Sequence, residues 1–193
     1  MEQLIFATNN LHKVEEIKKL IPGKSFDIKG LKEAGIIIDI PEPYDTLEKN
    51  ATEKSTVAYN LTKTNCFSED TGLEVEALDG EPGVRSARYA DDKTFKDNID
   101  KLLFNLKVKL NRKAQFRTVI SLILKGNEYT FEGICKGIII AERRGEKGFG
   151  YDPVFVPDGA EKTFAEMGLE EKNIYSHRRK AVDKLVGFLK NNL

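Results

Sequence analysis

The stretch CFSEDTG, from Cys66 to Gly72, holds the residues of this chain that are best suited to chemistry. A short apolar run ends there at two adjacent carboxylates, Glu69 and Asp70, and a hydroxyl and a glycine follow, where we expect the backbone to turn. Neighbouring carboxylates resist ionisation unless a cation lies between them. Clustered oxygen ligands suit Mg²⁺, which commonly binds together with phosphate groups. The stretch therefore suggests a magnesium and phosphate site, although by itself it also fits an ordinary acidic turn.

The first turn of the chain has the features of an anion site. Leu4–Thr8 has the apolar pattern of a buried strand, and apolar residues then recur at helical spacing over 11–21. Asn9 and Asn10 lie between the two patterns. A helix that starts after a strand directs backbone N–H groups at an anion, and Lys13 adds a positive charge. The alternative is a simple N-cap beside a surface lysine.

Two later segments offer groups that could bind a base. In GFGYDP, residues 148–153, glycines flank Phe149, so the backbone can approach a ligand and the ring can stack on a base. A glycine-rich hairpin with this ring in the core fits as well. In SHRRK, residues 176–180, cations stand at the start of a helix, which is unfavourable without an anionic partner. His177 and Arg178 could hydrogen-bond the edge of a base, or the segment could pair with nearby acids.

A carboxylate and a lysine complete the set of candidates. Glu42 lies between two prolines, whose rigidity could direct its carboxylate at a metal. Lys54 follows on the next expected helix. Each is, taken alone, typical of a solvated loop or helix surface.

The apolar patterns predict the elements that must position these residues. Helices are expected at 11–21, 46–64, 94–108 and 176–191, and a capping box at 163–166. Strands are expected at 4–8, 25–29, 36–40, 66–68, 73–78, 114–125, 128–142 and 154–156, with a hairpin turn at 125–127. Alternating strands and helices followed by a hairpin predict an α/β protein with a mixed sheet. No linker separates independent domains, so we predict one domain over 1–193, with a ligand cleft if it forms two lobes.

The composition limits the classes of partner and compartment. Lys and Arg number 31, as do Asp and Glu, whereas a general nucleic-acid binder carries a basic surplus. No apolar run approaches the length of a membrane span, and the first residues do not resemble a signal peptide. We therefore expect a cytoplasmic protein with neither nucleic acid nor membrane as a partner. Cys66 and Cys135 lie in apolar runs and are expected to be buried free thiols, with a disulfide as the alternative.

Several familiar nucleotide and hydrolase motifs are absent from the sequence. Pro22–Ser25 ends like a P-loop, but Lys18 stands where its first glycine would be. No GxGxxG follows a strand, which argues against a dinucleotide site. The chain has 2 histidines, too few to favour a zinc hydrolase or a Ser-His-Asp triad.

The candidate motifs, in their order along the chain, resemble those of the inosine triphosphate pyrophosphatase family, hydrolases of deaminated purine nucleotides. The series runs nearly from end to end: Thr8–Lys13, Glu42, Asn50-Ala51 with Lys54, Glu69–Leu73, Gly83 with Ser86–Tyr89, Gly148–Pro153, and Lys172 with Ser176–Arg178. Each motif is modestly specific, and the ordered set is highly specific.

The resemblance implies a fold, a reaction and a set of site residues. The fold would be two α/β lobes around a long mixed β-sheet with a central nucleotide-binding cleft, in a homodimer. The reaction would convert ITP, dITP or XTP to the monophosphate and pyrophosphate, with Mg²⁺ as cofactor. Asp70 would activate the water, and Glu42 and Asp70, with Glu69 nearby, would bind the metal. Substrate-binding positions would be Thr8, Asn9, Asn10, Lys13, Lys54, Thr71, Arg88, Phe149, Gly150, Tyr151, Asp152, Lys172, His177 and Arg178.

The sequence departs from the family pattern at two positions. Glu69 stands where the family usually has Asp, and its longer side chain could shift the metal. Asn9 stands where the family usually has glycine, and Asn tolerates a left-handed backbone better than most residues. Two alternatives follow: a pyrophosphatase for other modified nucleotides, including pyrimidines, and a nucleotide- or RNA-binding protein with weak or lost catalysis.

Overall fold

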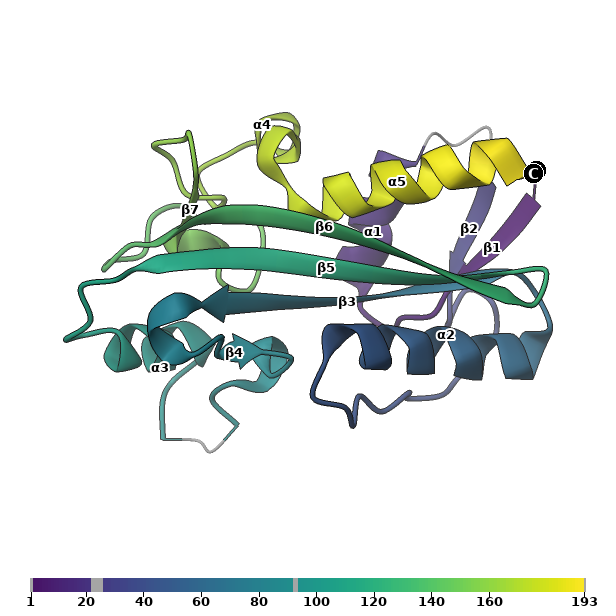
Figure 1. Ribbon diagram of the computed structural model, residues 1–193, viewed down its shortest axis with the longest axis horizontal. Coiled ribbons are helices and arrows are strands. Elements are labelled where there is room, and N and C mark those ends of the chain that lie inside the picture. The colour runs from purple at the N-terminus through teal and green to yellow at the C-terminus, as the bar shows by residue number, and fades with distance from the viewer. Residues whose placement is uncertain (1, 22–25, 92–93, 193) are drawn as a thin grey trace. The chain divides into compact units, whose positions relative to one another are not determined.

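The structure, a computed structural model, describes residues 2–21, 26–91 and 94–192. The P-loop-like segment Pro22–Ser25 lies outside the described residues. The strands form a mixed sheet in the order β2-β1-β3-β5-β6-β7, with β4 paired to β3 (Figure 1). The chain divides into two compact units, and β3, β5 and β6 contribute residues to both. The predicted α/β class with a mixed sheet is confirmed.

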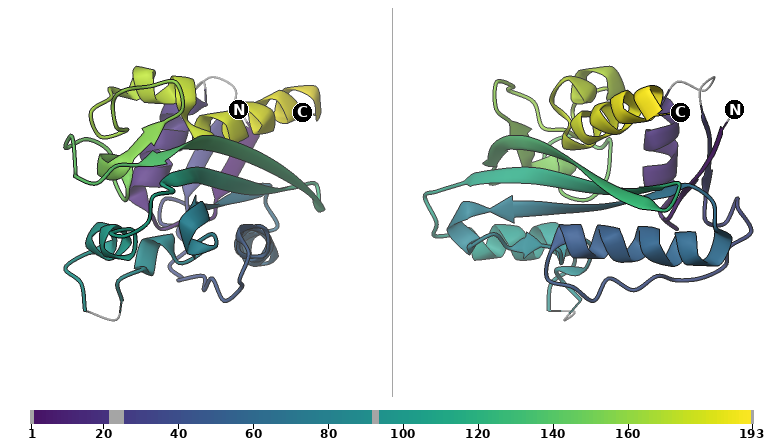
Figure 2. Two further views of the ribbon diagram at one scale, coloured as in Figure 1. Left: turned by 60° about the vertical axis from the view of Figure 1, so that its left-hand side comes forward. Right: turned by 45° about the vertical axis from the view of Figure 1, so that its right-hand side comes forward.

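Unit 1 contains residues 1–70, 118–133 and 180–193. Strand β1 pairs in parallel with both β2 and β3. Helix α2 covers one face of these strands, and α1 and α5 lie on the other (Figures 1 and 2). The elements concerned are β1 (Glu2–Phe6), α1 (Leu11–Leu20), β2 (Phe26–Gly30), α2 (Leu47–Thr62), β3 (Cys66–Val75), β5 (Lys113–Leu124), β6 (Asn127–Ile139) and α5 (His177–Asn192).

Alternation along the strands divides the core of unit 1 into two layers, because successive side chains leave a strand on opposite faces. Leu4 and Phe6 belong to the apolar cluster that includes α1 and α5. Ile5 and Ala7 belong to the cluster that includes Ala58 of α2. Strand β3 continues the pattern, since Phe67 packs in the first cluster and Cys66 in the second. The side chains that follow on β3 alternate between the same two faces.

Unit 2 contains residues 71–117 and 134–179 and has a separate apolar core. The end of β3 pairs antiparallel with β4, and β6 pairs antiparallel with β7. Phe116, Phe155 and Phe164 meet in the core, with Phe116 and Phe155 in an edge contact at 4.7 Å between ring centroids. Its remaining elements are β4 (Pro82–Gly83), α3 (Asn98–Asn105), β7 (Phe155–Pro157), α4 (Leu169–Tyr175) and 3₁₀ turns at Glu76–Leu78, Ser86–Arg88 and Asp152–Val154.

The hairpin between β5 and β6 agrees with the prediction from sequence. Lys125 and Gly126 join the strands, and both have positive φ, 51° and 83°. Two-residue hairpin loops favour such angles because they match the twist of the strands. The helix predicted at 46–64 is also confirmed as α2, with Thr46 as its N-cap.

Two strand predictions are wrong. Residues 36–40 form no strand and do not extend the sheet beyond its edge strand β2; Ile36, Ile38 and Ile40 pack on the apolar cluster that includes Ala58 instead. The expected break after Ser68 is also wrong. Strand β3 continues through the acidic residues to Val75, so the chain does not turn at them.

The helix predictions need two corrections. The helix expected at 94–108 begins later, at Asn98, because the Asp97 side chain accepts the Asp100 N–H at 2.9 Å and caps it there. The capping box at 163–166 forms its two reciprocal bonds but closes a turn, and α4 begins at Leu169. Helix α4 was missed, since its seven residues are too short for a periodic pattern.

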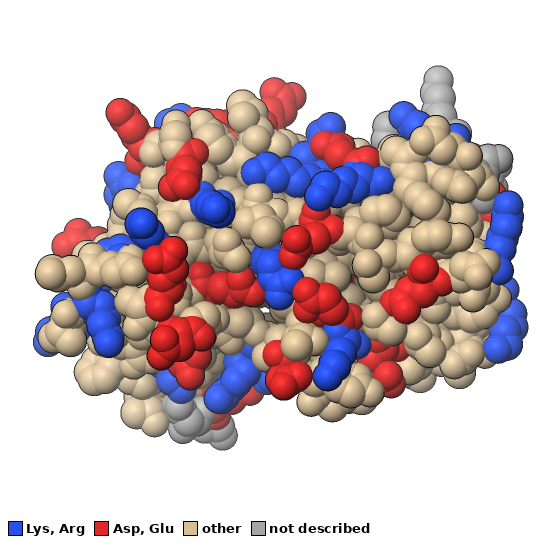
Figure 3. Space-filling model, in the orientation of Figure 1, with Lys and Arg blue, Asp and Glu red and all other residues tan. Residues whose placement is uncertain are grey.

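The surface agrees with the balanced composition. Lys and Arg lie interspersed with Asp and Glu on the face shown in Figure 3. No helix among the described residues is both long and apolar enough to span a membrane.

Both cysteines are buried free thiols, as predicted. Burial raises the pKa of the Cys66 thiol to about 12, so the reactive thiolate is scarce at neutral pH.

We expect native protein at pH 8 to react with Ellman's reagent roughly 10³-fold more slowly than free cysteine. Guanidinium-unfolded protein should release two equivalents at once and serves as the control. A thiol that reacts rapidly in the native protein would contradict this burial.

Candidate active site

The adjacent carboxylates of β3 point in opposite directions and meet different lysines. Asp70 lies on the α2 face, where Lys54 Nζ approaches its Oδ1 at 3.2 Å. Glu69 is on the α1 face, where Lys13 Nζ lies 3.2 Å from its Oε1. Neighbouring residues of a strand alternate between faces. The expectation of two carboxylates pressed together at a turn is therefore wrong, and each acid has a cation of its own.

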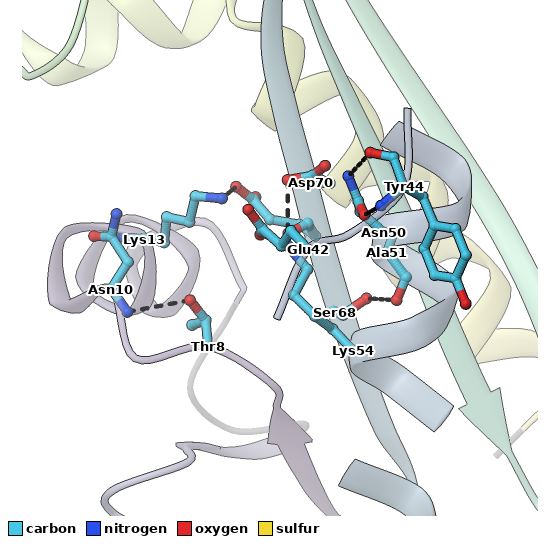
Figure 4. A network of polar contacts seen from close by, with 11 residues as sticks. Thr8, Asn10, Lys13, Glu42, Tyr44, Asn50, Ala51, Lys54, Ser68 and Asp70 are labelled. Carbon is cyan, nitrogen blue, oxygen red and sulfur yellow. Dashed lines mark hydrogen bonds and ion pairs between the residues drawn. The ribbon is translucent and has the colours of Figure 1, made fainter. Parts of the chain in front are cut away.

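Lys54 is the centre of the polar cluster in unit 1. Its Nζ donates to Glu42 Oε1, to the Glu69 carbonyl oxygen at 2.9 Å and to Asp70 Oδ1 (Figure 4). The side chains of Lys54 and Asp70 are each 7% exposed, so water screens their interaction little. The buried stripe of α2 places the lysine there, because positions 47, 50, 51, 54, 55 and 58 share one face of the helix.

Asp70 has one buried oxygen that is left over. Its Oδ2 is buried and accepts no hydrogen bond in the described structure. Burial raises the pKa of Asp70, Lys54 opposes the shift, and Glu42 adds to it. A buried carboxylate oxygen without a donor is costly, so this atom suits a cation or a proton that arrives with a ligand.

The carboxylates around Lys54 provide a partial cation site. Within the described residues, no three His, Cys, Asp or Glu side chains gather closely enough to hold a metal ion by themselves. Mg²⁺ commonly takes only one or two carboxylates from the protein and adds waters and substrate phosphates. The free oxygen of Asp70, with Glu42 bonded to the same lysine, provides such a partial site. Glu69 is engaged with Lys13 on the other face of β3.

The turn before α1 has the predicted cap. Asn10 Oδ1 accepts the Lys13 N–H at 3.3 Å, and Thr8 Oγ1 accepts the Asn10 N–H at 3.1 Å. Asn9 has no positive φ, so the left-handed backbone considered for it is not adopted. Its Nδ2 donates instead to the Ile38 carbonyl oxygen at 2.7 Å. The cap reading is confirmed, and Lys13 is directed at Glu69 and is not simply a surface lysine.

Unit 2 gathers most of the residues predicted to bind a base. Lys172 Nζ binds Asp152 Oδ2 at 2.8 Å and lies 5.5 Å from the centre of the Phe149 ring. The Arg178 guanidinium is also 5.5 Å from that ring centre. Lys172, Asp152 and Arg178 are buried, whereas Phe149 is only half-buried, so it is not simply a core residue. The Phe149 ring therefore has an accessible aromatic face with buried charged groups beside it.

His177 and Tyr151 have neighbours that constrain their orientation. The His177 ring stacks on Phe116, with centroids 4.7 Å apart and planes inclined by 13°. Tyr151 donates its hydroxyl to the Ser86 carbonyl oxygen at 2.9 Å. This bond ties Tyr151 to the 3₁₀ turn that carries Arg88. Tyr151 is therefore a support for that turn in the described structure, and Arg88 is half-buried at its end.

Sequence reasoning missed residues that support the site. Asn50 belongs to one of the sequence motifs but is not among the predicted site residues, although it is fully buried and bonded to the backbone of Tyr44. The signal was present, because Asn50 and Lys54 are four residues apart on the buried face of α2. Thr71 follows Asp70 on β3, and Gly150 has a positive φ of 63°.

Two glycines beside Phe149 give a matched test of the unit 2 cluster. Gly148 and Gly150 have φ of +74° and +63°, but only at Gly148 would a Cβ collide with Asp152, 2.0 Å from its Oδ2. Both alanine variants should lose about 1–2 kcal/mol from left-handed strain. We expect G148A to lose more stability than G150A, and to raise the KM for a nucleotide, because Asp152 must move from Lys172. Equal changes in Tm and KM would contradict this role.

The chain is similar to a known protein family over nearly its whole length: the model of the Ham1 family matches residues 4–188. The chain is 53% identical to a dITP/XTP pyrophosphatase of Porphyromonas gingivalis over 191 residues, 98% of each chain. It is 48% identical to a dITP/XTP pyrophosphatase of Flavobacterium johnsoniae over 188 residues, 97% of each chain. The solved structure of the Staphylococcus aureus Ham1 protein matches with a TM-score of 0.88, 38% identity and full coverage of both chains. A family match over nearly the whole sequence, with relatives this similar, shows that the chain belongs to the Ham1 family.

Proposed function

We propose that this protein is a magnesium-dependent nucleoside triphosphate pyrophosphohydrolase for deaminated purine nucleotides: dITP, ITP and XTP. It is thus a hydrolase of acid anhydrides. The observation that carries the proposal is the buried Lys54, which binds Asp70 and Glu42 while one oxygen of Asp70 is left without a donor. The names of the similar proteins support dITP and XTP as substrates.

In the proposed reaction, water attacks the α-phosphorus in line with the departing pyrophosphate. A new P–O bond forms from the water oxygen, and the bond from the α-phosphorus to the bridging oxygen breaks. Asp70 accepts the proton of the attacking water. Lys13, Lys54 and the N-terminus of α1 bind the charged phosphates. Asp70 and Glu42 would hold Mg²⁺, which would supply further positive charge for the phosphate oxygens.

Base selection is assigned to the cluster of unit 2. The Phe149 ring offers a stacking face, and Lys172, His177 and Arg178 offer donors to a 6-keto oxygen. Adenine presents an amino donor at that position, so these donors would be left unpaired beside it. Nucleotides with a 6-keto group should therefore be preferred over ATP.

A substrate panel tests this proposal. Pure protein with Mg²⁺ is incubated separately with dITP, XTP, GTP, ATP and dUTP, and pyrophosphate and phosphate are both measured. We expect pyrophosphate from dITP and XTP, with little product from ATP or dUTP. Turnover of dUTP in preference to dITP would favour a pyrophosphatase for modified pyrimidines. Binding of dITP without turnover would favour a catalytically weak binding protein, and free phosphate as the product would contradict the proposed bond cleavage.

A homodimer also belongs to the proposal, because the family resemblance implies it. Light scattering coupled to size exclusion measures the mass directly, and a species of the 21.8 kDa chain mass at all concentrations would contradict it.

A further inference from the structure

The loop that carries Glu42 is unusual because regular structure does not hold it. Residues 36–43 belong to neither a helix nor a strand, and α2 begins only at Leu47. Ile37 in this loop is 91% exposed, so apolar packing covers the loop incompletely. Nevertheless the Glu42 carboxylate meets Lys54 of α2. Hydrogen bonds other than those of a β-sheet must therefore hold the backbone that carries this carboxylate.

Asn50 of α2 holds the end of the loop through both ends of its amide. Its Oδ1 accepts the Tyr44 N–H at 2.9 Å, and its Nδ2 donates to the Tyr44 carbonyl oxygen at 3.1 Å. Both bonds are drawn in Figure 4. Asn50 is fully buried, where such bonds are shielded from water. Because the Tyr44 N–H needs the amide oxygen and the Tyr44 carbonyl needs the amide NH2, the orientation of the Asn50 side chain is fixed. Tyr44 is only two residues from Glu42.

Asn9 holds the other part of the loop. Its Nδ2 donates to the Ile38 carbonyl oxygen at 2.7 Å, across 29 residues of sequence. Its Oδ1 is buried and has no hydrogen-bond partner in the described structure. Asn9 stands in the turn between β1 and α1, four residues before Lys13, whose backbone N–H is capped in the first turn of that helix. One amide therefore links the loop to the proposed phosphate turn, and the other links it to the helix of Lys54.

We propose that Asn9 and Asn50 are positioning residues that hold Glu42 in place for Mg²⁺ and pyrophosphate groups. Glu42 lies in sequence between the two tied residues, Ile38 and Tyr44. A carboxylate on an untied loop loses its conformational freedom only when metal binds, which weakens metal binding. Residues behind a metal ligand commonly contribute about 10–100-fold to metal affinity or activity. The inference rests on the proposed function, since that assigns Glu42 to the metal.

The variants are chosen to separate positioning from folding. N50A removes both bonds to Tyr44, and N9G removes the bond to Ile38 together with the unpartnered Oδ1. Asn50 is buried and Asn9 only half-buried, so N9G keeps the test valid if N50A does not fold. N60A is the control, because Asn60 is an exposed asparagine on the same helix as Asn50.

Two measurements report how firmly the loop is held and how well it binds metal. Hydrogen exchange followed by mass spectrometry gives the amide exchange rate of the peptide covering 36–46, which contains the Tyr44 N–H bonded to Asn50. The exchange is repeated with excess inorganic pyrophosphate while MgCl₂ is titrated, which gives a Mg²⁺ midpoint that needs no turnover. The Mg²⁺ dependence of dITP hydrolysis gives a second midpoint, to be compared with the KM for dITP at saturating Mg²⁺.

We expect N50A and N9G to exchange faster in this peptide and to raise both Mg²⁺ midpoints by roughly 10-fold or more, with a smaller change in KM. N60A should match the wild type. Faster exchange without a shift of the Mg²⁺ midpoint would overturn the inference, since the ties would then be merely structural, and so would unchanged exchange. If the wild type hydrolyses no nucleotide, the proposed function fails, while the exchange midpoint with pyrophosphate still decides whether the amides support metal binding.

Discussion

The D70N enzyme is expected to hydrolyse dITP about 10²–10⁴-fold more slowly than the wild type at saturating Mg²⁺. The amide keeps the shape of the side chain but cannot accept the proton of the attacking water. It also replaces one of the two carboxylate oxygens with an NH2 group and removes the negative charge, which weakens the binding of a cation at the buried Oδ2 position. The measurement is kcat from pyrophosphate release, with the Tm recorded to confirm folding.

Folding of D70N should survive because Lys54 keeps two other acceptors, Glu42 and the Glu69 carbonyl oxygen. The matched control is D79N, the same substitution at an exposed aspartate whose left-handed φ of 52° suits Asn. D79N should keep full activity. Undiminished hydrolysis by D70N would remove Asp70 from the role of base.

The K54M variant is expected to lose both stability and activity. Replacing the lysine leaves the buried Asp70 and the half-buried Glu42 without the ammonium group that contacts both of them. Removing one partner of a buried ion pair commonly costs about 3–5 kcal/mol, since the remaining charge is left uncompensated. The loss of charge beside the phosphates should lower kcat by about 10²–10³-fold. Denaturant unfolding and initial rates measure the two losses.

The stability loss of K54M should depend on pH in a definite direction. Lys54 opposes the rise in the pKa of Asp70 that burial causes, so its removal raises this pKa further. A carboxyl whose pKa is higher in the folded than in the unfolded protein favours folding as the pH falls. The deficit should therefore be smaller at pH 5 than at pH 7. K49M, at an exposed lysine of the same helix, is the control, and an equal deficit at both pH values would contradict the mechanism.

The sequence by itself determined much of this protein. The periods of apolar residues predicted α1, α2 and the β5–β6 hairpin, because these elements follow from local patterns and turn residues. The order of motifs along the chain indicated the family, which the match over residues 4–188 shows. The local pattern gave a wrong prediction at 36–40, where isoleucines suggest a strand but the segment packs on an apolar cluster without joining the sheet.

The arrangement of the charges was decided by the tertiary structure. In sequence, Glu69 and Asp70 are neighbours and suggest one acidic pair. In the fold, β3 runs on through both, and its alternation sends one acid to Lys13 of α1 and the other to Lys54 of α2. Which helix covers which face of a strand depends on packing between segments that are distant in the sequence, so no local pattern could reveal these partners.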